Sequence, residues 1–462
     1  MDKKKLLVTA STFLRWEDDT EPRFVLDLCK AMSEYFDITV MVPACPGAKD
    51  KEVLEGIKVI RYHYFPIHKL ETLCYPGAIV PRIKQKKIRA LLVPFLFIGL
   101  WNALRKNLGD YDFVHAHWLI PQGIVQSFFD KPYIVTGHGG DVCSLNKGIV
   151  RKLKIRCIKR AKKVTVVSEH LKNRIHELVP NADIEIISMG VDTEAFGPQF
   201  RVENYFGQGD KKGILYVGRL ADIKGVTYLI EAMKYVDANL YIVGDGPLRE
   251  ELEEQAYRQA LEKDPGTRFQ TEATVIKGAA SPEPLKGKVY GNIVFIGSKT
   301  HKELKSIYAS ADIFCLPSIT AKGGDQEGMP TVLFEAMASG LPIVSTNTGG
   351  IKQLIKDGYN GLLCEEKCVW QIADNVSTLL NDEELYQKLQ ANGYEKAKDS
   401  SYKVRAAFYA REINTAMGIA TKTTAEANGV TDCMNSNSIT PPKFSEQAGL
   451  LALNCINLSR CA

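Results

Sequence analysis

The sequence lacks several features that would place it in a familiar class. It has no CxxC pair among its 11 cysteines, and no second pair of His or Cys near Cys364 and Cys368 completes a zinc site. Its net charge is only +5, which does not by itself indicate a nucleic-acid partner. Apolar residues make up 45% of the 462, which excludes wholesale disorder. We expect reduced, mostly buried thiols in a folded chain.

No uncharged apolar run reaches the ~20 residues that span a bilayer. The longest, Ala90–Leu104, is interrupted by Pro94 and Gly99. The basic start is followed by an apolar run that ends at Ala10, too soon for an export segment. The sequence therefore predicts a cytoplasmic protein that does not span a membrane.

Short apolar or β-branched runs alternate with helical patterns along most of the chain, which predicts parallel sheets covered by helices. Strands are expected at Leu6–Thr9, Ile38–Val42, Phe113–Ala116, Tyr133–Thr136, Lys163–Val167, Ile184–Ile187, Ile214–Val217, Leu240–Val243, Ile293–Ile296, Ile313–Leu316 and Pro342–Ser345. The helices expected between them include Arg23–Tyr35, Gly148–Arg160, Val226–Tyr235, Lys302–Ser310, Thr331–Ser339 and Trp370–Leu380.

The alternation pauses once, so two α/β domains are predicted. The boundaries are an N-terminal domain 1–198, a polar linker 199–212, a C-terminal domain 213–398, a C-terminal helix 399–420 that returns to the N-terminal domain, and a poorly ordered tail 421–462. Residues 263–290, rich in Gly, Pro and Lys, are interpreted as a surface insertion.

Neither domain carries a dinucleotide fingerprint. The loop after the first strand, residues 9–14, has no glycine, and residues 244–249 have Arg at the third glycine position. A nicotinamide or flavin enzyme is therefore not expected.

A glycine-rich loop at residues 323–330 leads into a helix that Pro330 begins and Gly340 ends. Such a helix start is an anion site made of free N–H groups and the helix dipole. Glu327 and Glu335 are on the order of 10 Å apart by helix geometry, a span that fits hydroxyls at two ends of a nucleotide sugar. The plainer alternative is one surface acid and one helix-face acid.

This segment resembles the E-x7-E motif of the retaining glycosyltransferases of family four. Further segments match that family in order over residues 5–415: 217–220 with 224–225, 243–247, 348–351 and 357–363 in the second half, and 115–118 and 136–141 in the first. The resemblance implies the GT-B fold, two Rossmann-like α/β domains facing across a cleft. One departure is the glycine-free loop after the first strand, where Arg15 stands.

The resemblance also assigns roles. Arg219 and Lys224 would hold the donor diphosphate, Glu335 the ribose, and Glu327 the donor sugar, beside the backbone of Gly328, Met329 and Pro330. His138 would reach the sugar from the other domain. His138, Glu327, Arg219 and Lys224 are the expected catalytic groups.

The remaining site predictions are less specific. The nucleotide base of the donor is expected to bind near Gly297. The candidate residues on the acceptor side of the cleft are Arg15, His117 and Asp141. Of His115 and His117, one is expected to face the cleft and the other the core. For Arg219 and Lys224 the alternative is a solvated loop pair, and for His138 a buried histidine bonded to backbone.

The expected reaction moves a hexosyl group from a UDP- or GDP-sugar to a glycan or lipid-linked acceptor, as in cell-envelope polysaccharide synthesis, with retention, no cofactor and no metal. A related epimerase and a non-catalytic nucleotide-sugar sensor remain alternatives.

Basic residues gather in two places. No acid occurs from Val142 to Ser168, and a basic cluster at 82–89 precedes the apolar run Ala90–Leu104. Basic next to apolar suggests peripheral contact with an anionic membrane at the inner face of the plasma membrane. The alternative is a buried helix with a solvated basic face. Aromatics are not interleaved with these bases, so nucleic acid is not expected.

Overall fold

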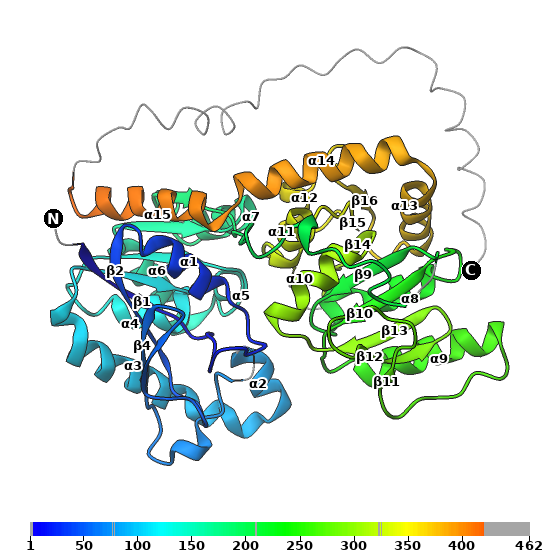
Figure 1. Ribbon diagram of the computed structural model, residues 1–462. Coiled ribbons are helices and arrows are strands. Elements are labelled where there is room, and N and C mark those ends of the chain that lie inside the picture. Colours follow the sequence, from blue (N-terminus) through cyan, green and yellow to red (C-terminus); the bar gives the residue numbers. More distant parts are fainter. Residues whose placement is uncertain are drawn as a thin grey trace, which may run out of the picture. The chain divides into compact units, whose positions relative to one another are not determined.

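The computed structural model describes residues 3–75, 77, 79–207, 210–321, 324 and 326–419, which belong to one compact unit. The predicted tail, residues 421–462, lies outside this part of the chain. Two sheets of eight strands each organise the described residues (Figure 1).

The first sheet is built from the N-terminal half, in the order β3-β4-β2-β1-β5-β6-β7-β8. Its pairs are parallel except for β3 with β4. The strands are β1 (Lys4–Thr9), β2 (Phe36–Pro43), β3 (Lys51–Leu54), β4 (Ile57–Tyr62), β5 (Phe113–His117), β6 (Tyr133–Gly137), β7 (Lys163–Val166) and β8 (Ile184–Ile186). β5 and β6 are buried along their whole length, as expected of central parallel strands.

The second sheet has the order β11-β12-β13-β10-β9-β14-β15-β16. Its strands are β9 (Gly213–Val217), β10 (Asn239–Val243), β11 (Thr274–Val275), β12 (Lys286–Tyr290), β13 (Ile293–Gly297), β14 (Ile313–Leu316), β15 (Ile343–Thr346) and β16 (Leu362–Cys364). β11 and β12 are antiparallel additions at one edge, so the predicted surface insertion 263–290 contributes two strands to the sheet. Its polar composition hid them, because edge strands tolerate lysine and glycine.

Helices follow most strands. The α-helices are α1 (Phe24–Met32), α2 (Ile79–Gln85), α3 (Val93–Asn107), α4 (Ile124–Gln126), α5 (Gly140–Cys143), α6 (Gly148–Arg160), α7 (Glu169–His176), α8 (Val226–Ala232), α9 (Arg249–Lys263), α10 (His301–Ser310), α11 (Thr331–Ala338), α12 (Ile351–Leu354), α13 (Val369–Asn381), α14 (Glu383–Asp399) and α15 (Tyr402–Ala416). The predicted strands and helices are present, with ends shifted by a few residues.

The last helix leaves the second half of the chain and packs on the first. α15 lies beside α1 in Figure 1, and its Ala406, Tyr409 and Ile413 are buried in the core that contains β1. The segment predicted as a polar linker also packs: Tyr205 and Phe206 are buried in the second core. These two aromatics explain why residues 199–207 are ordered against that half.

One helical run is longer than the sequence suggested. A short 3-10 helix (Lys87–Leu92), α3 and a second 3-10 turn (Leu108–Asp110) continue into one another over 24 residues, and an 18-residue window of this run has a mean hydropathy of 1.5. Among the described residues this is the one helix long and apolar enough to cross a bilayer by length and composition. That test is weak, because core helices of soluble proteins also pass it.

Candidate functional site

The carboxyl ends of three neighbouring strands meet in the second sheet. The N–H of Gly218 after β9 donates to Val243, and the N–H of Gly244 after β10 donates to Gly297 at the end of β13. A Cβ on Gly244 would lie 1.9 Å from the Gly218 oxygen, so only glycine fits there. Open parallel sheets bind ligands at this edge.

Lys224 stands at the start of α8 in the loop after β9. Gly225 follows with φ +62°, and its Cβ would lie 2.0 Å from the oxygen of Pro317, which fixes the turn. Lys224 Nζ lies 2.8 Å from Glu327 Oε1, and both side chains are largely buried, at 16% and 12% exposed. The two residues predicted to serve donor phosphate and donor sugar are thus an ion pair.

Arg219 precedes them in the same loop. Its carbonyl accepts a hydrogen bond from the Tyr216 hydroxyl at 3.0 Å, which holds the backbone. Its guanidinium is exposed, and no residue in the described part of the chain pairs with it. Because its backbone is held in place and its guanidinium is exposed to solvent, Arg219 could bind an anionic ligand.

α11 carries the second glutamate. Pro330 occupies the N-cap, one position earlier than predicted, and Gly340 with φ +77° follows the helix end as expected. Glu335 accepts a 2.8 Å hydrogen bond from the Tyr308 hydroxyl of α10. Burial raises the pKa of Glu335 to about 7, against the lowering effect of that hydrogen bond.

A pair of glycines fixes the loop that bears Glu327. The Gly350 N–H donates to the Glu327 carbonyl at 2.9 Å. A Cβ on Gly349 would lie 2.3 Å from the Glu327 oxygen, and one on Gly350 would lie 1.6 Å from the Gly328 oxygen. In the sequence, segment 348–351 was only a family-like motif. In the structure its two glycines pack directly against the backbone of the loop that carries Glu327.

The N-terminal half contributes a cluster of three histidines. His117 Nδ1 lies 3.0 Å from His138 Nε2, and His115 Nε2 lies 2.8 Å from the Thr136 hydroxyl. Burial lowers the pKa of His115 and of His138 to about 3, and that of His117 well below its ordinary value. The cluster is neutral at physiological pH.

The prediction that His115 and His117 face opposite ways is wrong. Both are buried, with ring centroids 4.2 Å apart. Residues i and i+2 of a strand point to the same face, so the pair shares one side of β5.

Asp141 organises the loop that carries His138. One carboxylate oxygen accepts from the N–H of His138 and of Gly139, and the other accepts from the N–H of Leu119. Burial raises the pKa of Asp141, and these donors oppose the rise. With both oxygens bonded to backbone, Asp141 positions the loop.

The histidine loop and the glutamate loop touch. A Cβ on Gly328 would lie 2.6 Å from the His138 carbonyl oxygen. Met329 packs against the cores of both halves. The structure therefore brings His138, Glu327, Lys224 and the Gly328–Pro330 backbone into one neighbourhood, with Glu335 one helix further in.

Arg15 is engaged inside its own loop. Its guanidinium binds Asp19 through two nitrogens at 2.8 and 2.6 Å and stacks on Trp16. The hydrogen bond with Asp19 raises the pKa of Arg15. The expected free cationic fork is thus held by a neighbouring acid, a pairing at i,i+4 that the sequence could have signalled.

At the end of β13, Lys299 pairs with Glu303 at 2.8 Å. Thr300 and Glu303 form a capping box at the start of α10. Gly297 has φ +84°, so the backbone turns sharply beside the strand ends where the base is predicted to bind.

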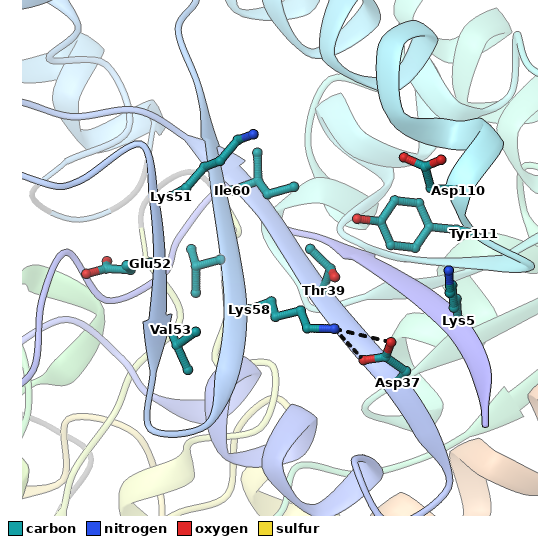
Figure 2. Close-up of a pocket in the computed structure, with 11 residues that line it drawn as sticks. Lys5, Asp37, Thr39, Lys51, Glu52, Val53, Lys58, Ile60, Asp110 and Tyr111 are labelled. Carbon is teal, nitrogen blue, oxygen red and sulfur yellow. Dashed lines mark hydrogen bonds and ion pairs between the residues drawn. The ribbon is translucent and has the colours of Figure 1, made fainter. Parts of the chain in front are cut away.

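A different hollow, of about 500 Å³, lies at the opposite edge of the first sheet (Figure 2). Its residues include Lys5, Thr39 and Lys58, from the starts of β1, β2 and β4, and Lys58 points to Asp37. Amino ends of parallel strands are not where such sheets bind ligands. A second cavity of about 20 Å³, room for one water, adjoins His117 and His138.

Potential metal ligands gather at His63, His68 and Glu71, whose ligand atoms lie within 4.8 Å of one another. Glu71 already accepts from His63 at 2.7 Å and from two backbone N–H groups. Both carboxylate oxygens of Glu71 therefore already accept hydrogen bonds within the protein, and the cluster belongs to the segment after β4.

Two family models match the chain. The model described as "Glycosyltransferase Family 4" matches residues 22–195, and the one described as "Glycosyl transferases group 1" matches 211–382. The chain belongs to glycosyltransferase family four. The segments that resembled the family therefore lie inside or beside matched regions.

Curated relatives agree. An uncharacterized glycosyltransferase of Methanocaldococcus jannaschii is 27% identical over 76% of this chain and 89% of its own. The N-acetyl-alpha-D-glucosaminyl L-malate synthase of Bacillus anthracis is 29% identical over 65% of this chain and 71% of its own. A GDP-mannose-dependent phosphatidylinositol monomannoside mannosyltransferase of Mycobacterium tuberculosis is 29% identical over 50% and 56%.

Solved structures share the fold. Sucrose-phosphate synthase from Thermosynechococcus elongatus superimposes with a TM-score of 0.66 at 18% identity, over 90% of this chain and all of the other. The Anabaena protein HepE in complex with UDP-glucose gives 0.63 at 17% identity, over 89% of this chain and all of the other. With its two Rossmann-like sheets, this glycosyltransferase has the GT-B fold.

Proposed function

We propose that this glycosyltransferase moves a hexosyl group from a UDP- or GDP-sugar to a glycan or lipid-linked acceptor with retention of configuration and without a metal. The observation that carries the proposal is the Lys224–Glu327 ion pair at the carboxyl edge of the second sheet, in which Lys224 shares the loop after β9 with Arg219. In this pair, Lys224 would bind the leaving diphosphate and Glu327 would bind the donor sugar.

The chemistry follows from where charge develops. Breaking the glycosyl–phosphate bond leaves negative charge on the diphosphate, which Arg219 and Lys224 stabilise. Removing one such fixed group typically costs 10²–10³ in rate, about 3–4 kcal/mol. Two cations and the start of α11 supply positive potential without a divalent ion.

The sugar side is built from neutral and acidic groups. Glu327 accepts from a sugar hydroxyl, and its ion pair with Lys224 fixes the carboxylate before the donor arrives. His138, neutral because burial lowers its pKa to about 3, offers a hydrogen-bonding group that does not repel the cationic anomeric carbon.

Names among the relatives include both a GDP-mannose-dependent enzyme and a UDP-glucose complex, so both bases stand in the proposal. The test is a panel of UDP- and GDP-sugars, scored by donor hydrolysis and thermal shift in EDTA and in magnesium. One nucleotide class that stabilises the protein, with turnover surviving EDTA, is the expected result. Turnover that vanishes in EDTA and returns with magnesium contradicts metal independence. Donor given without acceptor separates transfer from epimerisation.

A further inference from the structure

The helical run Lys87–Asp110, which contains α3, is apolar on two faces, and the core of the fold uses only one of them. Leu96, Leu100 and Leu104 are buried in the first half's core. On the other side Leu91 is 67% exposed and Ile98 is 56% exposed. A core helix of a soluble protein normally keeps its outer face polar, so this second face has another purpose.

The exposed apolar side chains form one continuous band, which we call the apolar stripe. It consists of Ile88, Leu91, Phe95, Ile98, Trp101 and Phe128. The first four follow one another at intervals of three or four residues and so share a face of the helical run. The Trp101 and Phe128 rings, 5.7 Å apart, extend the band onto the loop after α4.

Cations frame the stripe at both ends. Lys84, Lys86 and Lys87 precede it, and Arg105 and Lys106 follow it; all five are exposed, and none forms an ion pair with a described residue. No acid occurs from residue 72 to residue 109.

A further cation comes from another helix. Arg156 of α6 places its guanidinium 4.6 Å from the centre of the Phe128 ring. The nearby Asp130 is paired with Arg160 at 2.9 Å, which removes one potential counter-charge. The basic stretch of α6 therefore adjoins the apolar stripe.

We propose that the apolar stripe is a peripheral docking surface for an anionic lipid bilayer. Apolar side chains enter the headgroup boundary while the framing cations meet anionic headgroups. Trp101 is of the residue type that favours that interface. The inference does not depend on which sugar is transferred, because docking requires no turnover.

Charge favours a lipid surface over a protein partner. Lysine is depleted in protein interfaces, whereas here unpaired lysines border the apolar centre. A two-fold pair of this chain through the stripe would set like cations against each other. An anionic bilayer satisfies the apolar band and the cations at once.

The experiment is co-sedimentation of the full chain with vesicles of phosphatidylcholine alone or mixed with phosphatidylglycerol, at low and high salt. Wild type should bind the anionic vesicles and lose binding in high salt. Leu91→Asn with Ile98→Asn should weaken binding by roughly tenfold per side chain. The triple change Lys84→Gln, Lys86→Gln and Lys87→Gln should weaken it about a hundredfold, from about fivefold per cation.

Matched control variants remove similar residues that lie outside the apolar stripe. Trp370→Ser removes an exposed aromatic from α13, and Lys277→Gln, Lys388→Gln and Lys403→Gln remove three exposed lysines elsewhere. Both should bind vesicles like wild type, and all variants should keep donor-induced thermal shifts, which separates this test from that of the proposed function. Binding that ignores lipid charge and salt overturns the proposal. So does a stripe variant that binds vesicles normally, with or without dissociation of an oligomer.

Discussion

The two halves of the candidate site differ in the charge of their side chains. The second half offers charge: Arg219 exposed, and Lys224 and Glu327 paired at 2.8 Å. The first half offers neutral groups: His115 and His117 on β5, and His138 on a loop held by Asp141. Burial lowers the pKa of His115 and of His138 to about 3 and that of His117 well below its ordinary value. Under the proposed function, the charged second half would bind the anionic part of the donor, and the neutral first half would add no competing charge.

The strongest way to break this comparison is to remove charge from the second half. Lys224→Met should lower kcat/KM by 10²–10³, because one fixed cation at a leaving diphosphate is worth about 3–4 kcal/mol. Steady-state kinetics with the donor found by the panel measures it. Lys388→Met, an exposed lysine of α14, is the control and should leave the rate unchanged. A Lys224→Met enzyme with normal kcat/KM would place the diphosphate elsewhere.

The next test moves the glutamate loop without touching a charge. Gly350 has φ −80°, a conformation that any residue adopts, yet its Cβ would lie 1.6 Å from the Gly328 oxygen. Gly350→Ala should displace the loop and cost about 1–3 kcal/mol of donor binding, measured by calorimetry. Gly109→Ala, with nothing within 4 Å of its added Cβ, is the matched control. Equal donor affinity in both variants would show that the loop position does not matter.

The matching change in the first half is Asp141→Asn. The amide would turn an N–H toward backbone donors of Leu119, His138 or Gly139, leaving at least one unpaired. The loss should be about 2 kcal/mol in the free energy of unfolding, seen in denaturant titration, with kcat reduced. Asp130→Asn, at an exposed position, should do neither. Full stability with reduced kcat would instead make Asp141 a group that touches substrate.

The same comparison shows which parts of the fold can be predicted from the sequence. The alternation of apolar strands and helices predicted both sheets, because buried parallel strands leave strong local patterns. It missed β3, β4, β11, β12 and β16, all of which lie at or next to a sheet edge. Short edge strands such as Lys51–Leu54 are half polar and carry no such pattern.

The site divides in the same way. Local motifs singled out Lys224, Glu327 and Glu335 as candidates, whereas the residues that they contact come from distant segments. Tyr308, which bonds Glu335, lies 27 residues away, and no motif marks it. The i,i+4 pairing of Arg15 with Asp19 was readable in principle but was masked by the expectation of a phosphate contact.

The finest distinction between the halves is their response to pH. His115 and His138, whose pKa values burial lowers to about 3, should not titrate between pH 6 and 8, whereas burial raises the pKa of Asp27 to about 6 and that of Glu335 to about 7. An inflection in that range that disappears in Glu335→Gln therefore belongs to Glu335. Ribose hydroxyls favour its ionised form, and one pH unit below the pKa only about a tenth of the carboxyl is ionised. Donor affinity should therefore fall up to about tenfold from pH 8 to pH 6.

Glu335→Gln should flatten that profile while keeping an oxygen that accepts from Tyr308. Because burial raises this pKa, the ionised carboxylate destabilises the empty protein as pH rises from the ordinary glutamate range to 7, so the same variant should have a higher Tm above pH 7. Titration calorimetry and thermal melts across the range measure the two effects separately. A pH dependence that persists in Glu335→Gln would assign the titration to another group, and a lower Tm would mean that the charge is stabilised in place.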